Sequence, residues 1–185
     1  MKELSLHILD VVQNSIAAGS TFISIGIIED LKANLFSIEI TDNGCGMDKD
    51  YAEQIKDPFI TGRKSRKVGL GIPLLYAACK RCEGDLEIES KKGKGTRITA
   101  WLKHSHIDRA PLGNMADTIK ILIVCNPEVD FLYNHKKNGK KFDFDTREIK
   151  RILGDVSINE IEVLSWIEGQ VREGLKSLNG GADSL

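Results

Sequence analysis

Apolar residues along the first hundred positions follow two periods, one near 3.6 and one of 2, which are the periods of a helix face and of a half-buried strand. Residues 3–18 show the helical period, and residues 22–28 and 36–41 alternate as the two strands of a hairpin. The other elements expected here are helices over 48–56 and from Pro73 to Gly84, and strands over 85–89 and 96–102. This mixture predicts an α+β fold for residues 1–103.

The rest of the chain follows a polar connection. Residues 104–116 include Pro111 and Gly113, which disfavour regular structure. The elements predicted beyond it are strands over 119–125, 131–135 and 141–144, an Asn138-Gly139 turn, a short helix from Thr146 and a longer one over 158–175. We therefore interpret residues 117–185 as a C-terminal extension of a β-hairpin and helices that serves docking or dimerisation.

Length and charge narrow the functional classes. A chain of 185 residues that is 41% hydrophobic can bury one core with a small appended element. Its formal net charge of −1 gives no general attraction to nucleic acid or to a membrane surface. Apolar runs stay short of membrane-spanning length, and the amino terminus lacks a basic segment followed by an apolar one, so we expect a cytoplasmic protein.

The cysteines leave one alternative open. Four cysteines in a chain of this length fit reduced thiols in a cytosolic protein better than a disulfide framework. Cys79 and Cys82 have the spacing of half a zinc or redox site, although no second Cys-x-x-Cys or closely spaced histidine pair follows. A thiol or metal protein built around them is weighed against two cysteines that simply pack on a helix as small apolar residues.

Two glycine-rich turns carry the strongest functional signal. In the first, Asp42-Asn43-Gly44-Cys45-Gly46-Met47, a strand ends at a carboxylate, and the glycines let a flat or anionic ligand approach the backbone. The second, Val68-Gly69-Leu70-Gly71-Ile72, precedes a helix whose first amides can bind an anion. Either motif alone is common in ordinary turns, and neither matches the familiar phosphate loops, so it is their order that favours a nucleotide site.

Two further features agree with such a site. Glu3, His7, Asp10 and Asn14 recur at helical spacing and share one side of the first helix. Such a stripe is commonly a solvated face, but asparagine is a poor helix former in mid-helix, and its oxygen is a hard ligand of the kind that Mg²⁺ takes. Residues 57–67 carry four basic side chains and two hydroxyls, which we interpret as a flexible cover that approaches phosphates.

Taken in order, these motifs resemble a known family. They are Asp10-x-x-x-Asn14, Asp42-x-Gly44-x-Gly46, Gly69-x-Gly71 before a helix, and Gly93-x-Gly95-Thr96 before a strand. The same order is found in the ATP-binding domain of the GHKL (Bergerat-fold) superfamily, which includes DNA gyrase B, heat-shock chaperone ATPases, histidine kinases and MutL proteins. The resemblance covers residues 3–102, is most like a histidine kinase from Gly69 to Leu102, and implies a two-layer α/β sandwich with a mixed, mostly antiparallel sheet and helices on one face.

The resemblance also implies which residues would bind Mg²⁺ and ATP. Asn14 would coordinate Mg²⁺ between the phosphates, and Asp42 would accept a hydrogen bond from the adenine amino group, which selects against guanine. The other implied nucleotide contacts are Gly44, Gly46 and Met47 near the base and ribose, Gly69, Leu70 and Gly71 at the phosphates, Thr96 beside the carboxylate, and Thr61 and Lys64 in the basic loop. Asp10 is the candidate catalytic base, although hydrolysing members carry the longer glutamate there.

Three functions stay open at this point. The first is Mg²⁺-dependent ATP binding with hydrolysis or phosphoryl transfer to a protein partner, as in an anti-sigma-kinase-like protein or an orphan kinase catalytic domain. The second is a non-catalytic ATP sensor whose 57–67 loop is ordered by the nucleotide, and the third is the thiol or metal protein. No helical pair with a phosphoacceptor histidine precedes residue 3, so we expect a catalytic domain without its own acceptor. His7 is expected to be a hydrogen-bond partner near the nucleotide, and the C-terminal helix a homodimer contact.

Overall fold

The computed structural model describes residues 2–56 and 70–180. Its elements in chain order are α1 (Leu4–Ala17), β1 (Phe22–Asp30), β2 (Leu35–Asp42), α2 (Lys49–Gln54), α3 (Gly71–Arg81), β3 (Asp85–Lys91), β4 (Gly95–Lys103), α4 (Met115–Cys125), β5 (Asp130–Lys137), β6 (Lys140–Asp145), α5 (Thr146–Leu153) and α6 (Ile161–Leu178). Within these residues no helix is both long and apolar enough to cross a membrane.

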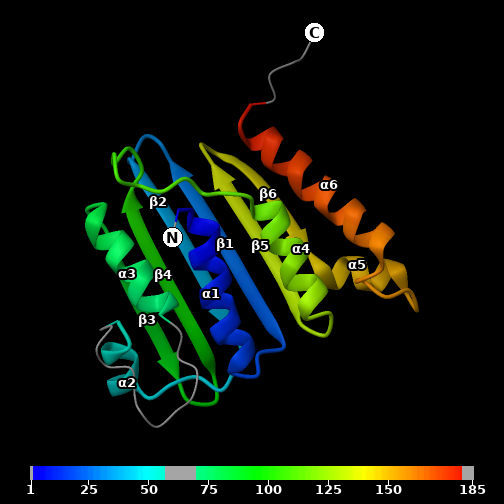
Figure 1. Ribbon diagram of the computed structural model, residues 1–185, viewed down its shortest axis with the longest axis horizontal. Helices are drawn as coiled ribbons and strands as arrows, with labels where there is room; N and C mark the ends of the chain where they lie inside the picture. Colours follow the sequence, from blue (N-terminus) through cyan, green and yellow to red (C-terminus); the bar gives the residue numbers. More distant parts are fainter. Residues whose placement is uncertain (1, 57–69, 181–185) are drawn as a thin grey trace.

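Six strands form one sheet in the order β3-β4-β2-β1-β5-β6 (Figure 1). Neighbouring strands are antiparallel except β1 and β5, which run parallel. The sheet is therefore mixed and mostly antiparallel, as predicted. The β5–β6 hairpin continues the sheet of the first hundred residues, and the division of the chain into residues 1–103 and an extension stays a prediction.

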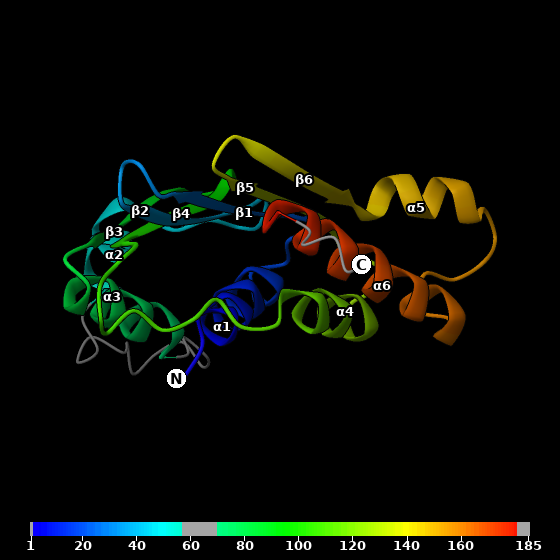
Figure 2. The ribbon, with the colours of Figure 1, turned by 90° about the horizontal axis from the view of Figure 1, so that it is seen from above.

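Helices α1, α3 and α4 lie side by side on one face of this sheet, with α6 on the same side, whereas α5 lies past the end of β6 (Figure 2). Alternation along β1 turns Ile23, Ile25 and Ile27 toward the helices, and each is at most 1% exposed. Leu4, Ile8, Val11 and Val12 of α1 meet them in the same buried cluster. Burial of these two apolar faces produces the predicted two-layer α/β sandwich.

One element predicted as a strand is a helix. Residues 119–125 belong to α4, which starts at Asn114, whose side chain accepts a hydrogen bond from the Asp117 amide. The run of isoleucine, leucine and valine there has the composition of a strand, because β-branched residues favour strands. However, the buried residues recur at helical spacing, and they are Met115, Ala116, Thr118, Ile119, Leu122 and Ile123. Tertiary packing on α1 and α6 therefore overrides the local preference.

The connection between β4 and α4 supports the start of α1. The amides of Leu4 and Ser5 donate to the carbonyls of Pro111 and Leu112 at 2.9 and 2.7 Å. The first amides of a helix have no partner within the helix, and α1 has no side chain that caps it. The connection therefore supplies the missing acceptors to the helix that carries Asp10 and Asn14.

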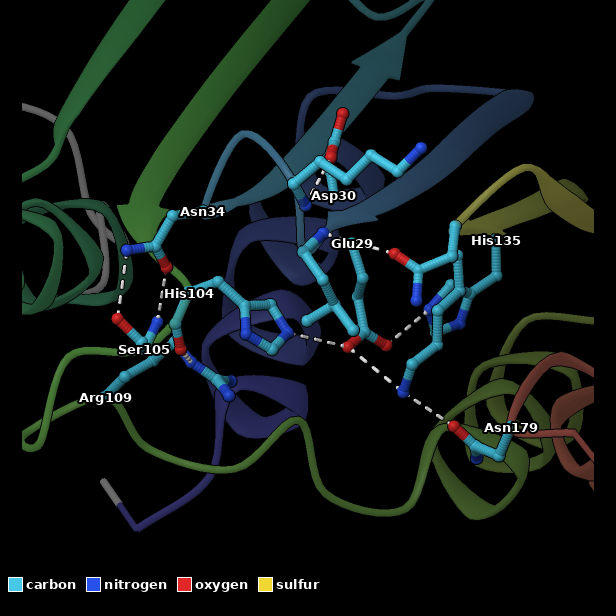
Figure 3. A network of polar contacts seen from close by, with 12 residues as sticks. Glu29, Asp30, Asn34, His104, Ser105, Arg109, His135 and Asn179 are labelled. Carbon is cyan, nitrogen blue, oxygen red and sulfur yellow. Dashed lines mark hydrogen bonds and ion pairs between the residues drawn. The ribbon is translucent and has the colours of Figure 1, made fainter.

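A buried polar network joins the connection to β1 and β5 (Figure 3). Glu29 Oε1 lies 3.0 Å from His135 Nε2, and Glu29 Oε2 lies 3.1 Å from His104 Nε2 and 3.3 Å from Lys137 Nζ. The hydroxyl of Tyr133 lies 2.9 Å from His135 Nδ1. His135 can donate from Nε2 to Glu29 and accept at Nδ1 from the Tyr133 hydroxyl, which satisfies both neighbours. The hydrogen bond from His135, the hydrogen bond from His104 and the charge of Lys137 lower the pKa of Glu29 to about 2, against the opposing effect of burial.

This pKa makes a prediction about stability. Because the pKa of Glu29 is lower in the folded than in the unfolded chain, its stabilising effect is complete above about pH 4.5 and is lost as the pH falls toward about 2. We expect Glu29→Gln to lower the free energy of unfolding by on the order of 2 kcal/mol at pH 7, and the difference from wild type to shrink across that pH range. Denaturant unfolding at several pH values measures it. Glu87→Gln, at an exposed position of β3, is the control and should change stability by less than about 0.5 kcal/mol. A Glu29→Gln deficit that stays constant with pH would contradict the assignment.

Candidate functional site

A cavity of about 540 Å³ opens between α1, α2 and the ends of β2 and β4. Its volume is within the range of small-molecule sites. The described residues that line it are Val11, Asn14, Ser15, Ala17, Ala18, Asp42, Cys45, Gly46, Met47, Tyr51, Ile55, Ile72, Thr96 and Ile98. Asn14 and Asp42, which are far apart in the sequence, therefore face one common space with mainly apolar walls and a few polar groups.

Asp42 ends β2, and its carboxylate is held by three donors. Ser15 Oγ donates to Oδ2 at 2.7 Å, while Ser20 Oγ and the Gly44 amide donate to Oδ1 at 3.1 and 2.8 Å. Asp42 is 9% exposed, and a carboxylate at that depth is costly unless such donors surround it. The donors come from α1, from the loop after it and from the glycine turn, so they fix where the sheet edge meets α1. Neither serine was predicted from the sequence as a partner of Asp42, although Ser15 directly follows Asn14.

The glycines of the first turn are required by protein packing. A Cβ on Gly44 would lie 2.6 Å from Ser20 Oγ, and a Cβ on Gly46 would overlap the carbonyl of Lys91. Gly46 also has a φ of 64°, a backbone conformation that residues with a Cβ rarely adopt. The sequence predicts that these glycines let a ligand approach the backbone, and that stays a prediction. In the structure they let neighbouring segments pass closely, and one of them, Gly46, lines the cavity.

Thr96 and Met47 lie beside the carboxylate. Thr96 is opposite Asp42 in the antiparallel pairing of β4 and β2. Ser90 connects the two, since its hydroxyl accepts a hydrogen bond from the Met47 amide at 2.8 Å and lies 2.9 Å from Thr96 Oγ1. Both Thr96 and Met47 line the cavity, so these two predicted positions come together with Asp42, and Ser90 is a supporting residue that the sequence did not reveal.

Asn14 presents a buried amide without a partner. Among the described residues nothing hydrogen-bonds to its Nδ2, and an unpartnered buried polar atom is unusual in a folded protein. The same residues contain no group of three or more His, Cys, Asp or Glu that could hold a metal ion. Mg²⁺ would be held by the side-chain oxygen of Asn14 and not by this nitrogen, as a shared ion whose other ligands would be phosphates and water.

Asp10 lies one turn before Asn14 and packs against the start of α3. A Cβ on Gly71 would lie 2.8 Å from the Cβ of Asp10, so α1 and α3 approach closely there. Leu70 precedes the helix and its side chain makes no capping bond, and the early amides of a helix are where an anion can bind. Asp10 itself is exposed and is not among the residues that line the cavity. Three further predicted contacts, Thr61, Lys64 and Gly69, lie outside the described residues.

His7 lies elsewhere, contrary to the expectation that it would neighbour the nucleotide. It lines a separate cavity of about 80 Å³ with Arg81, Cys82 and Asp108. Its Nδ1 is buried and has no hydrogen-bond partner among the described residues. Burial is the main effect that lowers the pKa of His7, which favours a neutral imidazole.

The two cysteines of the Cys-x-x-Cys motif are buried. Burial raises the pKa of Cys79 to about 12 and also raises the pKa of Cys82. Because the thiolate is the form that attacks disulfides and binds metals, such thiols are inert at neutral pH. The thiol or metal hypothesis thereby loses its support, and both side chains contribute to the apolar core instead.

A larger hollow of about 760 Å³ lies at the far end of the sheet, by the β1–β2 turn and the β5–β6 hairpin. Its polar wall consists largely of lysines, namely Lys32, Lys136, Lys140 and Lys141, all of them exposed. Lys141 already pairs with Asp143 at 2.6 Å. No predicted site residue lines this hollow, whereas several of them, including Asn14 and Asp42, line the smaller cavity.

A family model decides the classification. Residues 2–106 match the model described as histidine kinase-, DNA gyrase B-, and HSP90-like ATPase. The chain belongs to this ATPase family. The GHKL resemblance inferred from the four motifs is confirmed, and the matched segment contains every residue of the cavity.

Relatives of this ATPase family are much longer than the chain. A sensor protein of Shewanella frigidimarina (strain NCIMB 400) is 36% identical over 99 residues, which are 52% of this chain and 15% of that protein. Sporulation kinase E of Bacillus subtilis (strain 168) is 30% identical over 98 residues, which are 51% of this chain and 13% of the kinase. The match to each relative is therefore confined to one segment of a larger protein.

A solved structure extends the likeness of fold. The N-terminal domain of a DNA repair protein superposes with a TM-score of 0.55 at 18% identity, covering 84% of this chain and 58% of the other. At this identity the comparison concerns the fold alone. Because it covers 84% of the chain, the shared architecture continues past the segment that the ATPase family model matches.

The packing of the glycine turn can be tested with a matched pair. Gly46 and Gly93 both have a positive φ, of 64° and 74°, but a Cβ on Gly93 would meet nothing within 4 Å. We expect Gly93→Ala to lower the free energy of unfolding by about 1 kcal/mol, and Gly46→Ala to lower it by at least about 3 kcal/mol because overlap with Lys91 adds to the backbone strain. Denaturant unfolding of the two variants measures the difference. Equal losses would show that the turn is not closely packed.

Proposed function

We propose that the chain binds Mg²⁺-ATP in the cavity between α1 and the ends of β2 and β4. The observation that carries the proposal is that Asn14 and Asp42 line the same cavity, one with a free amide and the other with a buried carboxylate. Apolar walls formed by residues such as Ile72 and Ile98 suit the faces of a purine base. Membership of the ATPase family supports the choice of nucleotide.

In this proposal each end of the nucleotide has its own protein groups. Asp42 accepts from the adenine amino group, with Thr96 and Met47 beside it and Gly44 and Gly46 forming the turn below. Asn14 holds Mg²⁺ against the phosphates. The amides of Leu70 and Gly71 at the start of α3, together with Gly69, Thr61 and Lys64, approach the phosphates, where the helix end favours negative charge.

We further propose that the domain turns ATP over, by hydrolysis or by phosphoryl transfer to a protein. Asp10 supports this role because it is one turn from Asn14 and packs against Gly71, at the end of the site where the terminal phosphate would lie. Phosphoryl transfer depends on alignment and charge neutralisation, so a carboxylate that orients the attacking oxygen is the main contribution required of the protein. A sporulation kinase among the relatives supports a protein as acceptor or partner.

The alternative is a non-catalytic ATP sensor, and Asp10 is again the informative residue. The one-methylene departure from glutamate shortens the reach of the base toward a nucleophile. A protein that binds ATP without turnover would use the same cavity and signal through a partner contact.

A partner surface is proposed on the C-terminal helices. Ile152 of α5 and Ile161 and Trp166 of α6 are 83%, 80% and 53% exposed, and an apolar hollow of about 320 Å³ lies between the two helices. Exposed apolar groups gathered in this way are characteristic of interaction sites. We propose that they form a homodimer contact in a cytoplasmic protein, a location that four free cysteines suit. Sedimentation of the intact chain over a range of concentrations tests the dimer, and a monomer throughout would refute it.

Binding is tested first with charge-matched variants. Asp42→Asn replaces an acceptor by a donor at the position that would receive the adenine amino group, so we expect at least a tenfold weaker affinity for ATP. Glu39→Gln removes the same charge from an exposed position of β2 and should leave the affinity unchanged. Calorimetric titration with and without Mg²⁺ measures both, and chelation of Mg²⁺ should weaken binding to wild type but have little further effect on Asn14→Ala. An unchanged affinity in Asp42→Asn would refute the adenine contact.

Turnover is tested with Asp10→Asn. If Asp10 is the general base, release of phosphate or labelling of a protein from γ-labelled ATP should fall about 10²-fold or more, while ATP affinity stays within a factor of about three. Glu53→Gln, an exposed position of α2, is a matched control. Wild-type protein that binds ATP but transfers no phosphate, under any partner tested, would favour the sensor instead.

A further inference from the structure

The Asp42 carboxylate has a definite number of acceptor positions left for a ligand. Two carboxylate oxygens offer about four lone-pair positions. Among the residues that the structure describes, Oδ1 receives two donors, Ser20 Oγ and the Gly44 amide, and Oδ2 receives one, Ser15 Oγ. One position therefore remains open, and it belongs to Oδ2.

We propose that Ser15 and Ser20 are positioning residues that hold Asp42 as a pure acceptor with a single open position, and thereby make the cavity selective for purines with a 6-amino group. This inference rests on the proposed ATP-binding function and deepens it. A carboxylate saturated in this way can accept one more donor, which a 6-amino group supplies. A 6-oxo group instead brings a second acceptor against the charge.

The serines suit this role because neither hydroxyl is free to respond to the base. Both residues are 4% exposed, and each hydroxyl has one proton, which it gives to Asp42. A freely rotating hydroxyl could turn to donate to a 6-oxo group. Here such a turn would leave a buried carboxylate oxygen short of a donor, which costs free energy.

The surroundings hold the arrangement in place. Ser15 lies on α1 directly after Asn14, and both residues line the cavity, so the group that fixes the carboxylate and the proposed metal ligand occupy neighbouring positions of one helix. Ser20 reaches the carboxylate from the loop after α1, and a Cβ on Gly44 would lie only 2.6 Å from its hydroxyl. Glycine at position 44 thus admits the hydroxyl of Ser20 to Oδ1.

The test compares two nucleotides that differ at position 6 of the purine. Dissociation constants of the Mg²⁺ complexes of ATP and of inosine triphosphate are measured by calorimetry on the intact chain and on Ser15→Ala, Ser20→Ala and the double variant. We expect wild type to prefer ATP by about tenfold or more, each single variant to reduce that ratio severalfold, and the double variant to bring it within about threefold of unity. Ser37→Ala is the control, because Ser37 lies on β2 with its side chain on the opposite face from Asp42.

The ratio separates positioning from a merely structural role, which would lower the unfolding temperature and the affinity for both nucleotides together. Folded serine variants that bind both nucleotides more weakly but keep the wild-type ratio of affinities would overturn the inference. The proposed ATP-binding function would remain intact. Wild-type protein that binds neither nucleotide would instead overturn the proposed function itself. Loss of the preference in the serine variants, with Ser37→Ala unchanged, supports the assignment.

Discussion

The burial of one carboxylate constrains the geometry of the whole site. Asp42 lies at the end of a central strand with only 9% of its surface exposed, and a charge at that depth is tolerated only where donors surround it. Those donors come from α1, from the loop that follows it and from the turn that follows Asp42. They fix α1 against the end of β2. Asn14, on the adjoining position of the same helix, is thereby brought to the cavity that Asp42 enters.

The same constraint explains the glycine turn. Between α1 on one side and the β3–β4 turn on the other, positions 44 and 46 have no room for a Cβ, and a Cβ on Gly95 of the facing strand would overlap the carbonyl of Asp42. The turn therefore forms a rigid floor beside the apolar walls of the cavity. At the other end of α1, carbonyls of the connection at residues 111–112 accept from its first amides. The helix that carries Asp10 and Asn14 is thus tied to the sheet at one end and to the C-terminal part at the other.

The local periodicity of apolar residues predicted most of the elements, because the buried faces of α1, β1 and β2 are each formed by residues of one short stretch of sequence. It failed at residues 119–125, where strand-forming residues are buried at helical spacing on neighbouring helices. The parallel pairing of β5 with β1 has no local signal, since it joins segments about a hundred residues apart. Those misses are consequences of tertiary contacts, which no short window contains.

For the site, ordered motifs predicted which residues converge but not what supports them. Asn14, Asp42, Gly46, Met47 and Thr96 line one cavity, as the sequence implied, whereas Ser15 and Ser20 carried no motif that marked them as partners of Asp42. His7 shares the helix face of Asn14 but lies seven residues away, about 10 Å along the axis, and so belongs to another cavity. Helical spacing predicts which face of a helix a side chain is on. It does not predict which cavity along that face the side chain will line, because the packing of neighbouring elements determines that.

The central claim is that Asn14 and Asp42 hold opposite ends of one nucleotide. A crystal structure of the protein with Mg²⁺ and a non-hydrolysable ATP analogue tests this claim most directly. We expect the adenine amino group at Oδ2 of Asp42 and the metal ion on the side-chain oxygen of Asn14, with the phosphates toward the start of α3. A nucleotide bound elsewhere, or one bound in this cavity with its base away from Asp42, would show that the two residues do not hold one nucleotide.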